Sequence, residues 1–226
     1  MEGATARWYA RLRRSGSQPE TYRKQAAQLT ADLPSGADVL EVAPGPGYLA
    51  IEMARAGRFH VTGLDISATF VEIAGENARQ AAVSVEFRHG DVAGMPFDGE
   101  SFDLVVCQAA FKNFTQPADA LDEMHRVLRS GGTAVIQDMN KAASGADVDR
   151  EVQAMRLGRW NAFATRRAFA MLRRRAYSPA QFESLAAGSA FATHDVRTDG
   201  MSLEVRLTKR ATAENRATRP SGRPAD

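Results

Sequence analysis

The sequence contains a single cysteine, Cys107, among its 226 residues. A disulfide within the chain is therefore excluded, and with it the class of small secreted proteins that disulfides stabilise. The first residues also lack the apolar core of a signal peptide. No apolar run is long enough to span a bilayer, so we expect no transmembrane segment. Together these absences predict a cytoplasmic protein.

Excess charge of one sign is also lacking. The chain has 29 Lys and Arg against 27 Asp and Glu, a net charge of +2, so it is no polyelectrolyte and nucleic acid is not favoured as a partner. The four histidines and the cysteine show no metal-ligand spacing, and we predict no metal. A hydrophobic fraction of 44% can build a core, and the length fits one domain of moderate size.

What the sequence does contain is a glycine-rich turn between two apolar segments. Residues 39–42 form a short apolar run, which predicts a buried strand, and Ala43-Pro44-Gly45-Pro46-Gly47 follows at once. Apolar residues at 49–54 then begin a helical pattern. Glycines without a Cβ allow backbone N–H groups and a helix N-terminus to approach a ligand closely. Alone, such a turn is a weak signal.

The following segments strengthen that signal. Residues 60–65 predict a second strand that ends in Asp65, about 20 residues beyond the glycines, the offset at which an acid reaches ribose hydroxyls. Further strands are predicted at 85–92, 101–107 and 133–136, with a helix over 120–132 closed by glycines before the last of them. Alternating strands and helices predict an α/β, Rossmann-like sheet of mostly parallel strands with helices on both faces. Ligands of such sheets bind at the carboxyl ends of the strands.

The last strands have a different pattern. Residues 190–197 and 202–207 alternate polar and apolar side chains around a turn at 198–201, which predicts an antiparallel hairpin. The predicted organisation is an N-terminal helical cap at 1–37 (with a helix over 20–33), a ligand-binding core at 38–140, an Arg-rich helical lid of one or two helices at 141–178, the last helix and hairpin at 179–208, and a disordered tail at 209–226.

This ordered set of motifs resembles the class I S-adenosylmethionine-dependent methyltransferases, in particular the group that acts on small molecules. The resemblance covers residues 38–140 and, more faintly, the terminal hairpin. One residue departs from the family pattern: Ala43 stands where a glycine is usual. Because alanine is the smallest replacement, we expect a slightly altered turn and retained binding.

The resemblance implies S-adenosylmethionine as cofactor and assigns its site. The turn would line the amino-acid and ribose part, with Glu41 beneath it accepting from the ammonium or from loop N–H groups. Asp65 would accept from the ribose hydroxyls, and Asp91 from the adenine amino group. The implied cofactor-binding residues are Glu41, Ala43, Gly45, Gly47, Asp65, Ile66, Asp91, Val92 and Gln108.

Methyl transfer from a sulfonium to an O, N or C nucleophile is an in-line displacement that needs alignment more than a strong catalytic group. No strong catalytic motif is present. The candidates for contact with a small organic acceptor are Lys112, Asn113 and Asp138, and loop stabilisation is an equal alternative for the first two. Two other functions stay open: an NAD-dependent oxidoreductase, because Asp65 could hold an NAD ribose, and a non-catalytic S-adenosylmethionine-binding protein.

The segment 141–178 is the most individual part of the chain. Eight arginines lie between residues 150 and 175, and Glu151 is the one acid between Arg150 and Tyr177. This composition fits a solvated helix face, a grip on an anionic or aromatic acceptor, or a surface for a membrane or polymer. The oligomeric state, including a homo-oligomer, stays open.

Overall fold

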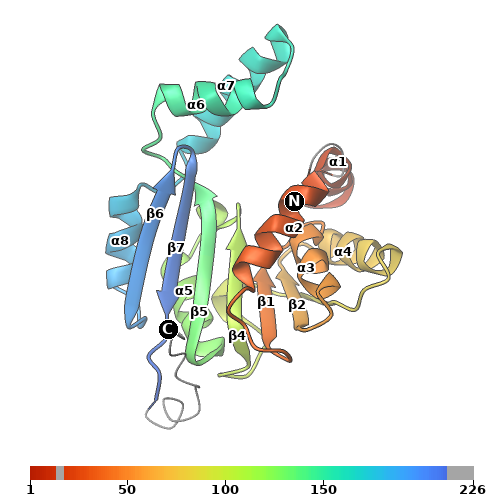
Figure 1. Ribbon diagram of the computed structural model, residues 1–226, viewed down its shortest axis with the longest axis vertical. Coiled ribbons are helices and arrows are strands. Elements are labelled where there is room, and N and C mark those ends of the chain that lie inside the picture. Colours follow the sequence, from red (N-terminus) through yellow and green to blue (C-terminus); the bar gives the residue numbers. More distant parts are fainter. Residues whose placement is uncertain (14–17, 213–226) are drawn as a thin grey trace, which may run out of the picture.

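The centre of the molecule is a seven-stranded sheet, seen in a computed structural model that describes residues 1–13 and 18–212 (Figure 1). The strand order is β3-β2-β1-β4-β5-β7-β6. β7 runs antiparallel to β5 and β6, and the other pairings are parallel. The strands are β1 (Asp38–Val42), β2 (His60–Asp65), β3 (Glu86–His89), β4 (Phe102–Gln108), β5 (Leu128–Met139), β6 (Thr193–Asp199) and β7 (Ser202–Thr208). The Rossmann-like sheet and its terminal hairpin are confirmed.

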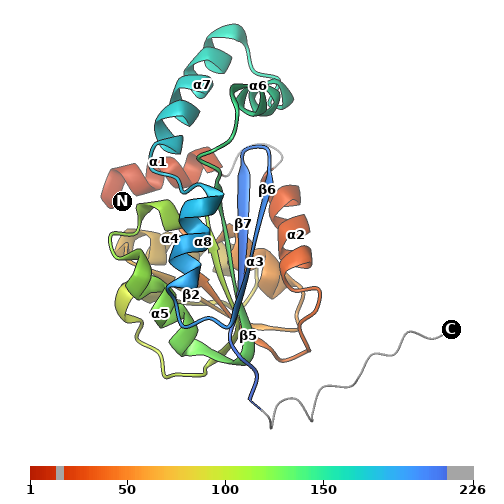
Figure 2. The ribbon, with the colours of Figure 1, turned by 90° about the vertical axis from the view of Figure 1, so that its left-hand side faces the viewer.

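Helices cover both faces of the sheet (Figure 2). The helices are α1 (Gly3–Arg13), α2 (Gln18–Leu29), α3 (Tyr48–Arg55), α4 (Ala68–Gln80), α5 (Pro117–Val127), α6 (Gly145–Ala154), α7 (Arg159–Arg173) and α8 (Pro179–Ala187), with short 3₁₀ turns η1 (Val92–Gly94) and η2 (Phe111–Asn113). One apolar cluster joins α2 and α3 to β1 and β4, and the other joins α5 and α8 to β4, β5 and β7. No helix of the described chain is both long and apolar enough to cross a membrane.

The strand alternation explains why these segments pair. β1 and β4 are buried along nearly their whole length, as expected of central parallel strands that helices cover on both faces. β7 alternates strictly, with Leu203, Val205 and Leu207 buried and their neighbours partly exposed. Its inward residues therefore cover one face of the sheet beside β5.

The predicted end of the helix before β5 is wrong. The helix expected over 120–132 ends at Val127. Leu128 already belongs to β5, where it pairs with Phe102 of β4. The glycines lie in a bend of the strand: Gly131 has φ +79°, and a Cβ on Gly132 would lie 2.9 Å from the carbonyl oxygen of Arg129. Both glycines are therefore needed for strand geometry rather than for closing a helix.

The chain before β1 also differs from the prediction. It holds two helices, of which α1 was not predicted, and the helix expected over 20–33 is α2, ending at Leu29. At the other end, the tail begins with ordered contacts: Lys209 donates through Nζ to the carbonyl of Leu128, 2.7 Å away. Residues 213–226 of the predicted disordered tail lie outside the described residues.

Candidate functional site

A cavity of about 320 Å³ opens at the carboxyl ends of β1, β2, β3 and β4. Loops that follow these strands form its walls, as the topology of an open parallel sheet requires. The cavity brings together eight of the nine residues predicted to bind the cofactor: Glu41, Ala43, Gly45, Asp65, Ile66, Asp91, Val92 and Gln108. These side chains come from separate parts of the sequence, and the shared strand edge unites them.

In the turn after β1, the backbone is left-handed at Ala43, Gly45 and Gly47. Ala43 has φ +54°, and its N–H donates to the carbonyl of Leu64 over 2.7 Å, which ties the end of β1 to β2. Gly45 also has φ +54°, and a Cβ built on it would meet nothing within 4 Å. Because Gly45 lines the cavity, its missing side chain leaves room for a ligand beside the backbone.

Glu41 lies beneath this turn and is 3% exposed. Its carboxyl group accepts from the N–H of Ala50, while Oε2 has no partner among the described residues. Burial raises the pKa of Glu41 to about 8, and the nearby Asp65 adds to the rise. A buried oxygen without a donor is costly, and it marks a place where a cationic or N–H-bearing ligand would fit.

Asp65 ends β2 and is 5% exposed. Its Oδ2 accepts from the N–H of Gly45 and its Oδ1 from the N–H of Ser67, both at 2.9 Å. Burial raises the pKa of Asp65, and these two hydrogen bonds oppose the rise. The carboxylate thus holds the glycine turn in place, and it also lies on the cavity wall.

Asp91 and Val92 form a third part of the wall, after β3. Asp91 caps η1, because its Oδ1 accepts from the N–H of Ala93 at 3.0 Å. Val92 is 9% exposed and packs into the core. Ile66, at the end of β2, is 62% exposed and offers an apolar surface to the same cavity.

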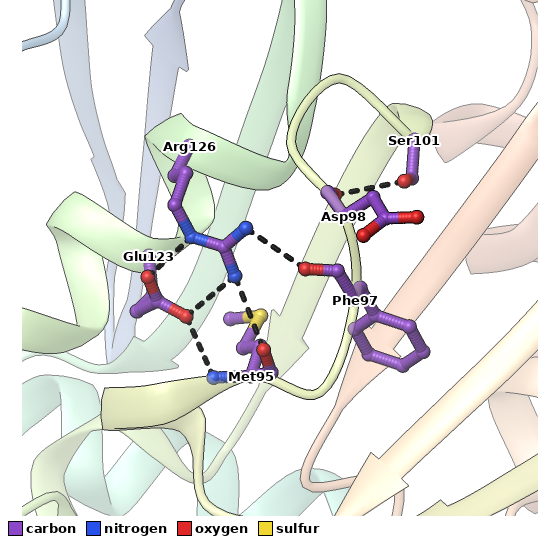
Figure 3. Close-up of polar contacts among 6 residues, drawn as sticks. All are labelled: Met95, Phe97, Asp98, Ser101, Glu123 and Arg126. Atoms are coloured by element: carbon purple, nitrogen blue, oxygen red, sulfur yellow. Dashed lines mark hydrogen bonds and ion pairs between the residues drawn. The ribbon is translucent and has the colours of Figure 1, made fainter.

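A polar network on α5 anchors the loop that follows η1 (Figure 3). Arg126 donates from Nε to Glu123 at 2.6 Å, from Nη1 to the carbonyl of Phe97 at 2.8 Å, and from Nη2 to the carbonyl of Met95 at 3.1 Å. Glu123 in turn accepts from the N–H of Met95 at 2.6 Å. This network fixes the chain from Met95 to Phe97, directly after the cavity segment.

Comparison with known proteins agrees with this site. Residues 40–136 match the model of a methyltransferase domain, a range that contains the wall segments at 41–45, 65–66 and 91–92. The chain is 36% identical over 124 residues to a demethylmenaquinone methyltransferase of Deinococcus radiodurans, covering 54% of this chain and 51% of that protein. It is 30% identical over 143 residues to a 2-phytyl-1,4-naphtoquinone methyltransferase of Synechococcus elongatus, covering 62% and 60%.

A solved structure of a SAM-dependent methyltransferase from Aquifex aeolicus superposes with a TM-score of 0.67 at 17% identity, covering 88% of this chain and 96% of that one. The chain therefore has the fold of a solved SAM-dependent methyltransferase, and residues 40–136 match a methyltransferase domain. The matches span about half of the length of the curated relatives.

Gly47, which the sequence also predicts to bind the cofactor, does not line the cavity. Gly47 is buried at the start of α3, with φ +79°. A Cβ on Gly47 would lie 2.8 Å from the ring of Phe87 and 2.9 Å from Cβ of Ala74. Gly47 therefore allows α3 to pack closely, whereas Gly45 provides the space at the cavity.

The three residues predicted to contact the acceptor lie in two different places. Asn113 lines the cavity, and so does Gln108, whose Nε2 lies 3.4 Å from Oε1 of Gln137. Lys112 and Asp138 lie outside the wall and bind each other, with Nζ and Oδ1 2.7 Å apart and side chains that are 9% and 5% exposed. Asp138 also accepts the N–H of Lys112 at 3.0 Å, so this pair braces the loop.

Several wall residues carried no sequence signal. Met1 and Tyr22 reach the cavity from the N-terminal segments, and Phe70, Phe114 and Tyr48 add aromatic surface. A helical pattern around Tyr22 was visible in the sequence, but the closure of α1 and α2 over the strand edge is a tertiary arrangement. In the described part of the chain, no residue of 141–178 lines the cavity, so the Arg-rich segment stays a predicted lid.

Proposed function

We propose that this chain is an S-adenosylmethionine-dependent methyltransferase, which moves the methyl group of that cofactor to an O, N or C nucleophile of a small organic acceptor. Within that class we favour a planar ring acceptor of the demethylmenaquinone kind. The observation that carries the proposal is a matched pair in one cavity: open space over Gly45 and a buried, unpartnered oxygen on Glu41. Together they suit a ligand that carries a cationic amine and whose neighbouring atoms pack directly against the backbone of the turn.

The remaining wall residues suit the other parts of that cofactor. The ammonium group would be held by Glu41, which ionises once a cation neutralises it. Asp65 has lone pairs beyond the two that its backbone donors use, and these can accept from ribose hydroxyls. Ile66 and Val92 would enclose the adenine ring, with Asp91 at its edge.

The acceptor would lie toward the loop after β4. Phe114 lines this part of the cavity, with its ring centroid 5.2 Å from that of Phe111 in an edge-on contact. Tyr22 adds a second aromatic ring to the wall. Aromatic walls favour a planar ring, and the names of the two curated relatives support the same acceptor class.

When bound, S-adenosylmethionine supplies an electrophilic methyl group on a positively charged sulfur. The protein's own residues would provide alignment and exclude water. The Asn113 amide can donate to an acceptor oxygen from the cavity wall. Lys112 and Asp138 would act as positioning residues, because their ion pair fixes the loop that carries Asn113.

The first test is calorimetric titration of S-adenosylmethionine, S-adenosylhomocysteine and NADH, followed by mass spectrometry of demethylmenaquinone analogues incubated with cofactor. We expect micromolar binding of both adenosyl ligands and an acceptor that gains one methyl group. Binding of NADH alone would restore the oxidoreductase alternative. Binding of the adenosyl ligands without turnover of any acceptor would leave the non-catalytic alternative.

A matched pair of glycine substitutions tests the cavity itself. Gly45→Ala and Gly57→Ala each place a Cβ at positive φ (+54° and +66°) where nothing lies within 4 Å, but only Gly45 lines the cavity. Both should lower the melting temperature similarly. Only Gly45→Ala should weaken S-adenosylmethionine, by about tenfold or 1.4 kcal/mol. Equal affinities in the two variants would contradict the assignment. A cytoplasmic location stays part of the proposal.

A further inference from the structure

The helices α6 and α7 form an arm that projects beyond the tip of the β6–β7 hairpin (Figures 1 and 2). Polar contacts join the two helices to each other and to the segment that leads into α6. Arg166 of α7 pairs with Asp149 of α6 at 2.5 Å, and Arg173 donates to the carbonyl of Lys141 at 3.2 Å. Val148 and Val152 of α6 are buried, but α7 has no buried residue.

The two sides of α7 differ in exposure. Residues 162, 165, 166, 169 and 173 are partly covered and lie on one side of the helix. The opposite side carries large apolar side chains that are exposed to an unusual degree: Trp160 at 86%, Phe163 at 58% and Met171 at 67%. We call the residues Trp160, Phe163, Arg167, Met171 and Arg174 the outward face of α7. Their spacing of three, four, four and three residues places them on one stripe.

Arginines outnumber the acids of this segment, and the acids of α6 pair with two of them. Of the eight arginines at 150–175, Arg150 and Arg166 pair with carboxylates of α6. Both cations of the outward face, Arg167 and Arg174, form no ion pair with any described carboxylate. Arg167 lies over the ring of Phe163, 5.9 Å from its centroid. Two cations therefore lie beside apolar and aromatic side chains on one exposed surface.

We propose that the outward face of α7 docks on an anionic lipid surface. A helix that lies in a membrane interface presents Trp, Phe and other apolar side chains to the acyl boundary while Arg side chains reach the negative headgroups. A nucleic-acid surface needs the arginines but offers no place to bury Trp160, Phe163 and Met171. The apolar side chains therefore favour lipid, and the unpaired arginines select an anionic one. The inference does not depend on the proposed methyl transfer.

The docking can be measured by sedimentation of the full chain with vesicles. We expect binding to vesicles that contain phosphatidylglycerol, weakening as salt is raised, and little binding to pure phosphatidylcholine. The chain has two tryptophans, so a Trp8→Phe background leaves Trp160 as the reporter. Its fluorescence should shift to the blue on binding, because the ring leaves water.

Two sets of variants separate the apolar and the charged contributions. Trp160→Ala with Phe163→Ala and Met171→Ala should lower vesicle partitioning at least tenfold. Arg167→Glu with Arg174→Glu should do the same and remove the preference for anionic lipid. The matched control is Arg23→Glu with Arg79→Glu, the same change of charge at exposed helix positions of α2 and α4. The control should bind like the parent, and all variants should keep their affinity for S-adenosylmethionine, which reports an intact fold.

Four results would overturn the proposal. The parent chain fails to sediment with anionic vesicles, or the outward-face variants bind as well as the control. In the third, the chain binds duplex DNA and not vesicles, which would make the outward face of α7 a binding surface for nucleic acid. If α7 instead closes over the acceptor as a lid, Trp160 fluorescence would respond to acceptor and not to lipid, and docking would again be excluded.

Discussion

The N–H of Gly45 donates to Oδ2 of Asp65 over 2.9 Å, across 20 positions of sequence. This hydrogen bond joins the turn after β1 to the end of β2. The second oxygen of the same carboxylate holds the N–H of Ser67, at the start of α4. One buried carboxylate thus organises two loops of the cofactor cavity, so its removal should affect folding and binding together.

Asp65→Ala should weaken S-adenosylmethionine by about 1–3 kcal/mol, because it removes a ribose acceptor and leaves two backbone N–H groups without their partner. Calorimetry at constant pH measures the loss. The control is Ser67→Ala, since the Ser67 hydroxyl caps α4 by accepting from the N–H of Phe70 and lies outside the cavity wall. That variant should lose about 1 kcal/mol of stability and keep its cofactor affinity. Unchanged affinity in Asp65→Ala would contradict its assignment.

Glu41 predicts a pH dependence of stability. Its folded pKa is raised from 4.5 to about 8, so the folded state binds more protons than the unfolded state between these values. The free energy of unfolding should therefore fall as pH rises from about 4.5 to 8 and level off above that. Asp65, whose pKa is also raised, adds a fall of the same sign. Urea unfolding across this range should show a flatter profile in Glu41→Gln than in the parent.

The same residue predicts proton release on binding. If the ammonium of S-adenosylmethionine contacts Glu41, the carboxyl group should ionise and release a proton at pH 7. Calorimetric enthalpies in buffers of different ionisation enthalpy would then differ for the parent and agree for Glu41→Gln. Glu183→Gln, an exposed position on α8, should behave as the parent. A buffer-independent enthalpy for the parent would rule out the contact.

The sequence predicts the sheet and the strand-end residues well because both depend on local patterns. Apolar runs, glycine turns and terminal acids place Glu41, Asp65 and Asp91 at one edge, once the strands are assumed parallel. Gly47 shows the limit of that reasoning. Its role depends on Phe87 and Ala74, which lie far along the chain and approach only in the folded protein.

Other differences have the same origin. In the sequence, Gly131 and Gly132 look like the end of a helix, because glycine occurs both at helix ends and in bends of strands. The pairing of Leu128 with Phe102 shows that they lie in a strand. Likewise, Lys112 and Asp138 are separated by 26 positions, and their mutual pairing cannot be read from either segment. Such tertiary contacts leave no local pattern, whereas the mostly parallel sheet and its terminal hairpin agree with the patterns in the sequence.

Ala43 predicts a stabilising substitution. Its φ of +54° lies in the left-handed region that favours glycine. Ala43→Gly should relieve this strain and, after the added entropy of glycine, raise stability by about 0.5–1 kcal/mol. Ala82→Gly is a matched control with φ +53° outside the cavity wall, and it should gain a similar amount. Thermal unfolding with and without S-adenosylmethionine measures both; a loss of stability in both variants would show that the left-handed strain is negligible.

The pair of Arg126 and Glu123 predicts a loop-specific loss. Arg126→Met removes the donors to the carbonyls of Met95 and Phe97, and should cost about 1–2 kcal/mol, because the pair is partly exposed. The Arg126 hydrogen bond lowers the pKa of Glu123, so this contribution is present above pH 4.5 and is lost as pH falls through the lower, folded value.

The control is Arg79→Met, since Arg79 and Glu76 form the same i,i+3 pair at 2.8 Å with both side chains mostly exposed. The control should change stability by less than about 0.5 kcal/mol. Urea unfolding at neutral and acidic pH compares the two, and equal losses would mean that the carbonyl contacts of Arg126 add nothing.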